Sequence, residues 1–407
     1  MAVSQRLDLD QALQRMLMDV VQPSAQEAVA TGDALGRVLA KTITAPIDLP
    51  PFDASAMDGF ALRADDVAGG PPRTLMLSGT SLAGHPMTAP IDAGQCARIF
   101  TGAPMPAGAD AVAIQEDCTL EGDRVRFEQP VRSGDHVRPA GHDVRRGTPL
   151  LERGRTLNAF DLGWLAASGI HTVSAYPRLT VAILSTGDEL REPGMPLTPG
   201  AIFDANRTLL RALLSRLPVD VIDLGIVPDS QERIAETLLQ ADQDADLVIC
   251  SGGVSVGDAD WVKRVVEDVG SLQLWRLNLK PGKPLAYGRL RRAAFFGLPG
   301  NPVSAVVTLL LVVRPVLEAM LGARPTAPPM TTAVLRTGLM HEPGREEYQR
   351  GTLRLVDGVG EVTVTGDQSS NRLASFAQAN CLIRIPKAYG DLEAGTRVMV
   401  LPFYGLL

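Results

Sequence analysis

The chain has 407 residues, which predicts two to four domains at roughly 150 residues per domain. Apolar residues make up 45% and charged residues 21% of the sequence, so the chain can bury sizeable cores and is not globally disordered. The 46 acidic residues exceed the 39 lysines and arginines, for a net charge of −7, and aromatic residues are only 4%. These values argue against nucleic-acid binding through bulk positive charge or base stacking.

Cysteine use and hydropathy favour a soluble cytoplasmic protein that crosses no membrane. The four cysteines are scattered without a C-x-x-C pair, which predicts reduced thiols rather than a disulfide framework or a thiolate zinc site. The first 20 residues alternate charges with Leu and Met and lack the apolar core of a signal peptide. The longest apolar run, Val303 to Val313, is shorter than the roughly 18 residues that span a bilayer.

The first part of the chain is expected to place helices around a β-rich domain. Residues 1–45 read as helical, and the prolines of residues 45–52 then enforce an extended segment, because proline cannot donate a backbone hydrogen bond. Glycine and proline punctuate short alternating runs over residues 53–143, the pattern of a small β-rich domain. Residues 156–170 return to a helical period.

Strands and helices alternate in the middle of the chain, from residue 178 to about residue 322. Strands are predicted over residues 179–184, 219–227, 247–250, 273–277 and 294–297, and helices over residues 204–217, 229–241, 258–269 and 302–321. This alternation predicts a parallel sheet with helices on both faces. After Pro325 only strand-like segments remain, over residues 332–335, 352–355, 361–365, 381–385 and 397–401, which predicts a small β-barrel or sandwich.

Four loops are expected at the carboxyl ends of the strands, where open α/β sheets bind ligands. They are residues 185–189, 228–229, 251–260 and 297–302. The third loop carries Gly252, Gly253 and Gly257, which allow close approach of a ligand, and the helix expected after it presents free N–H groups suited to phosphate. No Walker A or G-x-G-x-x-G motif is present, so an ordinary glycine-rich turn is the alternative.

Five carboxylates fall on the same expected edge of the sheet: Asp188, Glu189, Asp229, Asp258 and Asp260. Mg²⁺ takes one or two carboxylates together with phosphate oxygens, so this group suggests a magnesium site. Helix capping is the alternative for Asp229 and Asp258, and the chain after Asp229 has the spacing of a capping box.

Basic and hydroxyl side chains further along the chain suggest a site for an oxyanion. Lys280 and Lys283 lie in a turn that prolines make rigid, and Arg276 precedes it. Solvated surface lysines are the common alternative. Arg350 and the pair Ser369-Ser370 could also donate hydrogen bonds to an anion, but sequence alone does not bring them near the lysines.

Seven short motifs carry a resemblance to a known family. They are residues 42–61, 101–106, 185–190, 251–260, 279–284, 297–304 and 368–370. In the first of them, Ser55-Ala-Met-Asp-Gly-Phe60, local rules alone would make Asp58 a turn former, and the same holds for Asp143. In this order, over essentially the whole chain, the motifs resemble the molybdopterin molybdenumtransferase family, which includes bacterial MoeA and the E domain of gephyrin.

The resemblance implies an enzyme of molybdenum cofactor biosynthesis. Such an enzyme inserts molybdate into adenylylated molybdopterin and releases AMP, with Mg²⁺ as cofactor. The family is a homodimer with each active site between subunits, and transient contacts are expected with the molybdopterin adenylyltransferase and with proteins that deliver the cofactor to molybdoenzymes. No nucleic acid or membrane is expected as a partner. The alternatives are a catalytically silent cofactor-binding scaffold and the molybdopterin adenylyltransferase, which shares the α/β domain.

The resemblance also implies an α/β multidomain fold with four parts. A segmented helical domain would cover residues 1–52 and 144–177, with part of residues 27–45 able to pack on the α/β domain. A β-rich domain would cover residues 53–143, a three-layer α/β molybdopterin-binding domain residues 178–326, and a C-terminal β-barrel residues 327–407.

Three groups of site residues follow from the family motifs. The catalytic group is Asp58, Asp143, Glu189, Asp229 and Asp260, of which Glu189, Asp229 and Asp260 would hold the metal. The substrate-binding group is Thr101, Thr186, Gly187, Ser251, Gly252, Gly253, Ser255, Pro299, Gly300 and Pro302. The molybdate group is Lys280, Lys283, Arg350, Ser369 and Ser370. The chain departs from the usual motifs at His142, Ala205 and Arg276, which leaves the reaction class intact.

Overall fold

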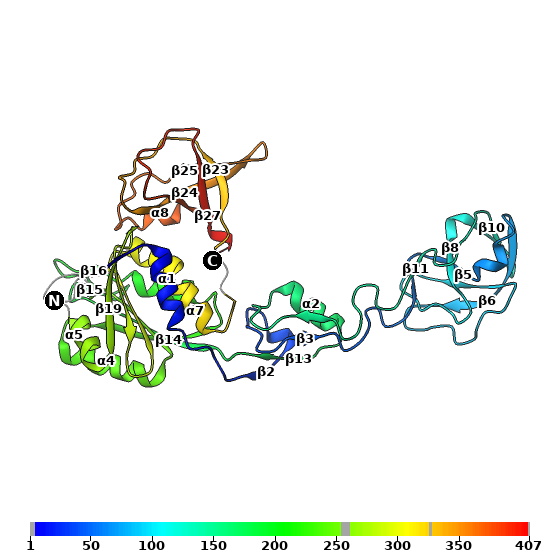
Figure 1. Cartoon of the computed structure of the whole chain (residues 1–407), viewed down its shortest axis with the longest axis horizontal. Coiled ribbons are helices and arrows are strands. Elements are labelled where there is room, and N and C mark those ends of the chain that lie inside the picture. Colours follow the sequence, from blue (N-terminus) through cyan, green and yellow to red (C-terminus); the bar gives the residue numbers. More distant parts are fainter. Residues whose placement is uncertain (1–4, 254–260, 325–327, 406–407) are drawn as a thin grey trace. The chain divides into compact units, whose positions relative to one another are not determined.

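The computed structural model describes residues 5–253, 261–324 and 328–405. Contacts between residues divide the chain into two compact units, each described below by itself. One unit holds Met1–Glu27, Gly36–Ala40 and Ala175–Leu407, and the other holds Ala28–Leu35 and Lys41–Ser174. Figure 1 labels the main elements along the chain.

A seven-stranded sheet forms the centre of the first unit, with strand order β1-β19-β21-β22-β18-β14-β17. Its strands are β1 (Gln5–Leu7), β14 (Leu179–Thr186), β17 (Val219–Val227), β18 (Leu247–Ser251), β19 (Ser271–Leu277), β21 (Pro284–Arg289) and β22 (Ala294–Leu298). Most pairs are parallel, but β21 runs antiparallel to both β19 and β22. The prediction of an all-parallel sheet is wrong here, because the links on either side of β21, residues 278–283 and 290–293, are too short for a parallel crossover.

Helices cover both faces of this sheet, which confirms the three-layer α/β architecture. Strand side chains alternate between faces. Val181 and Ile183 of β14 accordingly pack in one core, with α1 (Leu9–Met18) and α3 (Asn206–Leu214). Ala182 and Leu184 pack in the other, with α4 (Gln231–Asp244) and α5 (Trp261–Val269). Burial on both sides explains why β14 is an almost unbroken apolar run.

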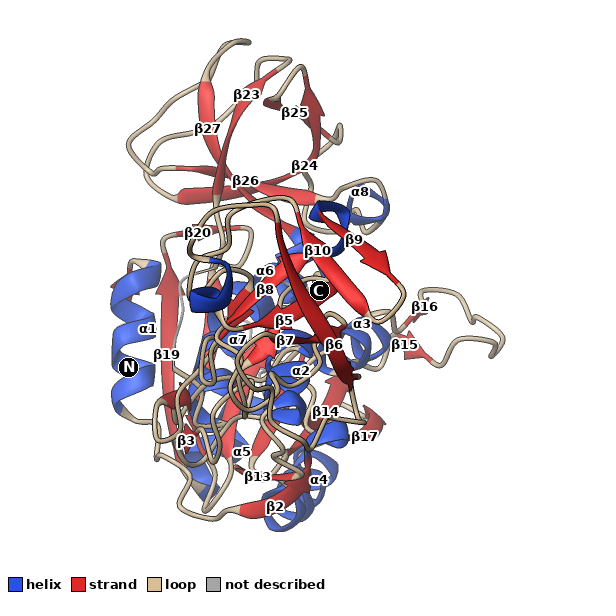
Figure 2. Cartoon of the chain, turned by 90° about the vertical axis from the view of Figure 1, so that its right-hand side faces the viewer, coloured by secondary structure: helices blue, strands red, loops and turns tan. Residues whose placement is uncertain are grey.

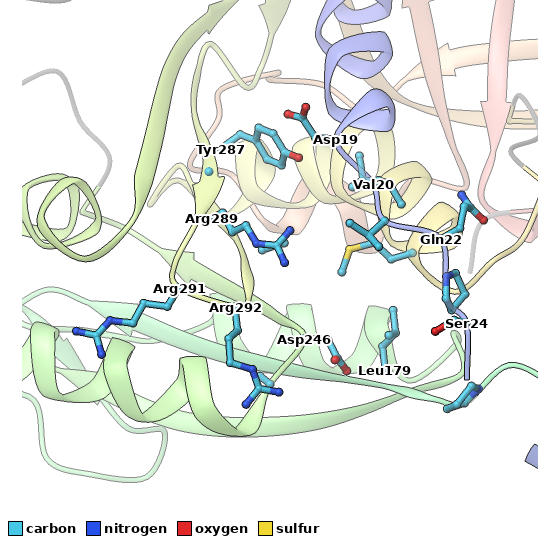
Figure 3. Close-up of a pocket in the computed structure, with 18 of the residues that line it drawn as sticks. Asp19, Val20, Gln22, Ser24, Leu179, Asp246, Tyr287, Arg289, Arg291 and Arg292 are labelled. Atoms are coloured by element: carbon cyan, nitrogen blue, oxygen red, sulfur yellow. The ribbon is translucent and has the colours of Figure 1, made fainter. Parts of the chain in front are cut away.

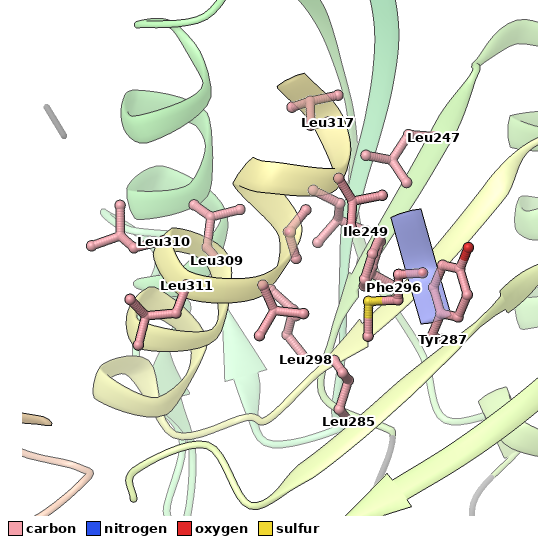
Figure 4. Packing of buried hydrophobic residues seen from close by; sticks show 14 of the residues in the cluster. Leu247, Ile249, Leu285, Tyr287, Phe296, Leu298, Leu309, Leu310, Leu311 and Leu317 are labelled. Atoms are coloured by element: carbon pink, nitrogen blue, oxygen red, sulfur yellow. The ribbon is translucent and has the colours of Figure 1, made fainter. Parts of the chain in front are cut away.

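The predicted helix over residues 302–321 is confirmed as three consecutive pieces. They are α6 (Pro302–Thr308), the π-helical turn η4 (Leu309–Val313) and α7 (Arg314–Met320). Pro315 has no backbone N–H to donate within the helix, and the wider π turn, which ends two residues before it, makes room for the proline ring. Leucines of this helix pack in one cluster with Ile249 and Phe296 of the sheet (Figure 4).

This same helix is the one, among the described residues, that is long and apolar enough to cross a membrane. However, 78% of its apolar window is buried inside the protein. Its apolar character is therefore explained by packing on the sheet.

The helical prediction for residues 1–45 is confirmed only for α1, whose Leu9, Ala12 and Met16 are buried in the α/β core. Strand β2 (Glu27–Ala30) pairs with β13 (Thr172–Ala175), and the 3-10 turn η1 (Thr31–Asp33) follows it. Pairing with a distant segment overrides the local helical preference at β2.

A closed five-stranded β-barrel forms the C-terminal part of the first unit, as predicted. Its strands are β23 (Thr331–Leu335), β24 (Glu346–Val356), β25 (Val359–Val364), β26 (Cys381–Ile385) and β27 (Arg397–Pro402), drawn in red in Figure 2. The long strand β24 pairs with both β25 and β26, which closes the barrel. The short strand β20 (Leu279–Lys280) also joins β24, so the lysine turn lies against the barrel.

The second unit is built around a six-stranded sheet, which confirms the β-rich domain. Its strands are β5 (Gly59–Leu62), β6 (Arg73–Ser81), β7 (Gln95–Ile99), β8 (Ala111–Ile114), β9 (Cys118–Glu121) and β10 (Arg124–Phe127), in the order β8-β5-β7-β6-β10-β9. Two short pairs accompany it: β3 (Ile43–Thr44) with β12 (Pro149–Leu151), and β4 (Ala54–Ser55) with β11 (Val137–Arg138). Helix α2 (Ala159–Ala167) falls inside the predicted helical segment, and the Asn158 side chain caps it.

Candidate functional site

A cavity of about 760 Å³ lies at the carboxyl ends of β14, β18 and β22, the edge where α/β sheets bind ligands. All four loops predicted for this edge contribute to its wall. The predicted site residues that line it are Thr186, Gly187, Glu189, Asp229, Ser251, Gly252, Gly253, Pro299, Gly300 and Pro302. The structure thus brings together the described members of the two groups that were predicted to bind substrate and metal in this domain.

The turn after β18 fits only glycine. Gly252 and Gly253 have φ angles of 92° and 64°, in the left-handed region. A Cβ atom on Gly252 would lie 2.7 Å from the carbonyl oxygen of Thr186, and one on Gly253 would lie 2.4 Å from Cγ2 of Val262. The ends of β14 and β18 are therefore in direct backbone contact beneath the cavity.

Two hydroxyl groups of the cavity wall have no partner. Ser185 and Thr186 are 1% and 5% exposed, and their Oγ and Oγ1 atoms make no hydrogen bond within the described structure. A buried polar group without a partner costs about 1–3 kcal/mol. A ligand with hydrogen-bonding oxygens in this cavity would recover that cost.

Asn206, at the start of α3, links the loops of the cavity, a role that the sequence analysis did not assign. Its Nδ2 donates to Oγ of Ser251 at 2.7 Å and to the carbonyl oxygen of Gly300 at 2.8 Å. The neighbouring Asp204 is 2% exposed, accepts from the backbone N–H of Asn206 and pairs with Arg207. In the sequence, these polar residues stand together at the start of a helix. Polar side chains at such a position are usually solvated, so the pattern did not indicate a buried role.

Glu189 and Asp229 bring negative charge to the cavity. The backbone N–H of Asp229 donates to Oδ1 of Asp188 at 3.1 Å. Partial desolvation and the charges of Asp188 and Glu189 raise the pKa of Asp229. A cation would relieve this repulsion, which is what a metal site between carboxylates requires.

The helix-capping alternative for Asp229 is wrong. The N-cap of α4 is Ser230, whose side chain accepts from the backbone N–H of Arg233 and donates to Glu232. The serine fulfils the capping role, so the carboxylate of Asp229 stays at the cavity.

The residues present fit a magnesium ion that is shared with a ligand. Within the described ranges, no three His, Cys, Asp or Glu side chains are grouped closely enough to hold a metal ion by themselves. Mg²⁺ does not need such a cage, because it keeps several waters and binds one or two carboxylates plus phosphate oxygens. The remaining residues predicted for this edge, Ser255, Asp258 and Asp260, lie outside the described residues.

Arg350, Ser369 and Ser370 lie together and connect to the cavity. Arg350 is fully buried; its Nε donates to Oγ of Ser375 and its Nη2 to the carbonyl oxygen of Ser369. Burial lowers the pKa of Arg350 to about 10, which leaves it cationic at neutral pH. The hydroxyl of Ser370 accepts from Nδ2 of Asn301, which lines the cavity.

The two lysines of the predicted molybdate group have different surroundings. Glu347, a buried carboxylate that the sequence analysis missed, accepts from Nζ of Lys280 at 3.2 Å and lies 2.7 Å from Nδ1 of His341. Lys283 lines a separate small cavity together with Arg276. The charge of Glu347, the partner of Lys280, also acts on Arg350 and favours its cationic form.

Asp58 and Thr101 meet in the second unit. Oδ1 of Asp58 accepts from both the backbone N–H and the hydroxyl of Thr101, each at 2.8 Å. These bonds lower the pKa of Asp58. Asp143 belongs to the same unit, and its backbone N–H donates to the carbonyl oxygen of Leu49. Asp58 therefore does more than form a turn, since it holds the loop at Thr101.

A larger cavity, of about 850 Å³, lies at the opposite, amino-terminal edge of the sheet (Figure 3). Leu179 and Ala294, the first residues of β14 and β22, line it together with Asp246, just before β18. None of the predicted site residues in the described part of the chain lines it. Cavity size alone therefore does not identify the functional edge.

The fold and the 760 Å³ cavity define the class of protein. It is a multidomain α/β protein whose sheet presents glycine turns, unpartnered hydroxyl groups and carboxylates to a ligand at its carboxyl edge. Three family models match the chain in order. They are "MoeA N-terminal region (domain I and II)" over residues 7–169, "Probable molybdopterin binding domain" over residues 182–319 and "MoeA C-terminal region (domain IV)" over residues 332–403.

Individual relatives agree with these models. The molybdopterin molybdenumtransferase of Haemophilus influenzae is 41% identical over 404 residues, which cover 98% of this chain and 100% of the relative. The enzyme of the same name from Nostoc sp. is 38% identical, over 92% of this chain and 88% of its own. The crystal structure of a molybdopterin biosynthesis MoeA protein from Pyrococcus horikoshii has a TM-score of 0.84 at 29% identity, over 97% of this chain and 99% of that one. The chain belongs to the molybdopterin molybdenumtransferase family.

Proposed function

We propose that this protein transfers molybdenum from molybdate into adenylylated molybdopterin and releases AMP. The observation that carries the proposal is the cavity at the carboxyl edge of the sheet, where the unpartnered hydroxyls of Ser185 and Thr186 lie with Glu189 and Asp229. Hydroxyl groups without a partner suit phosphate oxygens, which accept hydrogen bonds. Membership of the family makes the chain an enzyme of molybdenum cofactor biosynthesis and supports a substrate related to molybdopterin.

The molybdate group is assigned to Lys280, Lys283, Arg350, Ser369 and Ser370. A tetrahedral dianion needs cationic and hydroxyl donors in fixed positions. Arg350 is the most rigid of these side chains, because burial and its bonds to Ser375 and Ser369 hold the guanidinium in one orientation. The link from Ser370 through Asn301 to the cavity supports delivery of molybdate to the bound pterin.

Magnesium is assigned to Glu189 and Asp229, together with Asp260. The ion would offset the negative charge that develops on the phosphate oxygens as the phosphoanhydride breaks. The raised pKa of Asp229 supports this role, because it reports a site where negative charges repel one another in the absence of a cation.

Asp58, Thr101 and Asp143 extend the proposal to a homodimer. They belong to the β-rich domain, and they would complete the active site of a second copy of the chain. This part rests on the family motifs that carry the three residues. The proposed surroundings are the cytoplasm, where reduced thiols suit the four free cysteines, with the molybdopterin adenylyltransferase and cofactor-delivery proteins as transient partners.

Molybdate-dependent release of AMP from adenylylated molybdopterin in the presence of Mg²⁺ tests the proposal. Glu189→Ala should lower the rate by at least about 100-fold, the scale expected for loss of one electrostatic group of an active site. Glu236→Ala, on the exposed side of α4, is the matched control and should behave like the wild type. Absence of molybdate-dependent AMP release would leave the scaffold alternative, and an unchanged rate in Glu189→Ala would remove Glu189 from the catalytic group.

The same assay tests the dimer. Asp58→Ala and Glu189→Ala should each be inactive, and a mixture that exchanges subunits should regain activity. Such heterodimers contain one site in which both residues are intact. If activity does not recover although subunit exchange is verified, both residues belong to a site made by one subunit.

A further inference from the structure

A small cationic cavity of about 280 Å³ lies beside β1, the end of β19 and the loop before β24. Its basic side chains are Arg6, Arg276, Lys283 and Arg345, and its one acidic side chain is Glu342. It is distinct from the 760 Å³ cavity, since the two share no lining residue. Four cations against one carboxylate make it the most basic of the described cavities.

The strand register forces two of these cations together. β1 and β19 are parallel neighbours, and Arg6 lies directly opposite Arg276. Leu7 and Leu277, the next pair along, are buried in the core, so the two arginines extend from the other face of the sheet. Like charges at directly opposite positions destabilise a sheet unless something compensates them.

The one carboxylate that lines the cavity, Glu342, forms no ion pair with these cations among the described residues. Arg6, Arg276, Lys283 and Arg345 make no side-chain hydrogen bond or ion pair to any described residue. In addition, Nε of Arg276 is buried and has no hydrogen-bond partner. A buried donor without an acceptor and a cluster of unpaired cations require the same thing, an anion with several acceptor oxygens.

We propose that this cavity binds a tetrahedral dianionic oxyanion through Arg6, Arg276 and Arg345. Guanidinium groups suit this ligand because each offers a planar fork of N–H donors. The cavity is smaller than the roughly 300–1,000 Å³ typical of sites for drug-sized molecules, which favours a small inorganic ion. Sulfate, phosphate and molybdate share this chemistry. Lys283 lies both in this cavity and in the proposed molybdate group, so molybdate is the expected occupant, a step that rests on the proposed function.

Direct binding to the full-length protein tests the site. Isothermal titration with molybdate, sulfate and phosphate should show a dianion-binding event that is separate from the one at Arg350. Arg6→Gln and Arg276→Gln should each weaken this event about 10- to 100-fold, the loss expected for one charge-assisted contact. Arg354→Gln, an exposed arginine of β24, is the matched control and should leave it unchanged.

Thermal unfolding separates a binding role from a structural one. In buffer without dianions, Arg6→Gln and Arg276→Gln should unfold at the wild-type temperature or above it, because each removes a like-charge repulsion. The rise in Tm that the wild type shows with added dianion should shrink in both variants. A preference for molybdate would identify the substrate as occupant, and equal affinities would identify a general oxyanion site; both support the proposal.

Two results would overturn it. One is the absence of any dianion binding beyond a single event at Arg350. The other is an unchanged affinity in both arginine variants. Neither result depends on release of AMP, so failure of this site and failure of the proposed reaction can be told apart.

Discussion

Replacement of Gly252 by alanine should destabilise the α/β domain through two separable effects. The φ angle of 92° is one that an L-residue adopts at a cost of about 1–2 kcal/mol. The new Cβ would lie 2.7 Å from the carbonyl oxygen of Thr186, which is backbone of β14 and cannot rotate away. Forced overpacking of this kind costs about 1–3 kcal/mol. We therefore expect Gly252→Ala to lower the free energy of unfolding by about 2–5 kcal/mol.

Gly200→Ala isolates the contact with Thr186. Gly200 has a similar φ angle of 84°, but an added Cβ would meet no atom within 4 Å. Both variants restrict the unfolded chain equally. The control should therefore lose only about 1–2 kcal/mol, and the difference between the two variants measures the steric term.

Urea unfolding followed by tryptophan fluorescence provides the measurement. The chain has three tryptophans, and in a Trp164→Phe background the signal comes from Trp261 and Trp275, both in the α/β domain. The slope of unfolding free energy against urea should stay constant across the variants. Equal losses in Gly252→Ala and Gly200→Ala would refute the close contact between the ends of β14 and β18.

Two further predictions concern charged groups. Glu347→Gln should lower the free energy of unfolding, measured in urea, by about 1–3 kcal/mol. This is less than the roughly 3–5 kcal/mol typical of a broken buried pair, because Lys280 is 39% exposed and regains water. Glu361→Gln, in a more exposed pair, is the control, and equal losses of stability in the two variants would contradict the burial argument. Thr101→Val removes one of the two bonds that lower the pKa of Asp58. Because the pKa of Asp58 is lower in the folded state, its carboxylate stabilises the protein at pH values above the ordinary pKa of 3.8. This stabilisation is lost as the pH falls through the folded-state pKa. The variant has less of it to lose and should therefore unfold at a higher pH during acid titration. A carboxyl titration by NMR checks this, and an unchanged pKa for Asp58 would disprove the contribution of the hydroxyl.

The strands of the α/β domain were predictable because their signal is local. β17 has the bounds predicted for it, and β14 and β18 extend by only one or two residues, since burial on both faces requires continuous apolar runs. Strand β21 was not predicted, and the error in sheet direction follows from that omission. Its direction depends on pairing with β19 and β22, which no local pattern specifies.

The candidate site divides in the same way. The glycine turn at Gly252 and the carboxylate Glu189 follow strands directly, so their place at the sheet edge could be read from chain order. For Asp229 the sequence left capping and metal binding open, and the structure decided between them because Ser230 occupies the cap. The role of Asn206 was not assigned from the sequence, because both of its acceptors lie on loops far away along the chain.

The sequence by itself determined the main strands and helices of the α/β domain and the family, because apolar period, turn chemistry and ordered motifs are written along the chain. Only the tertiary structure decided which charges meet. The register of β1 on β19 places Arg6 opposite Arg276, and the pairing of β20 with β24 places Lys280 beside Glu347. Electrostatic interaction depends on distance in space and on burial, and neither is a function of separation along the sequence.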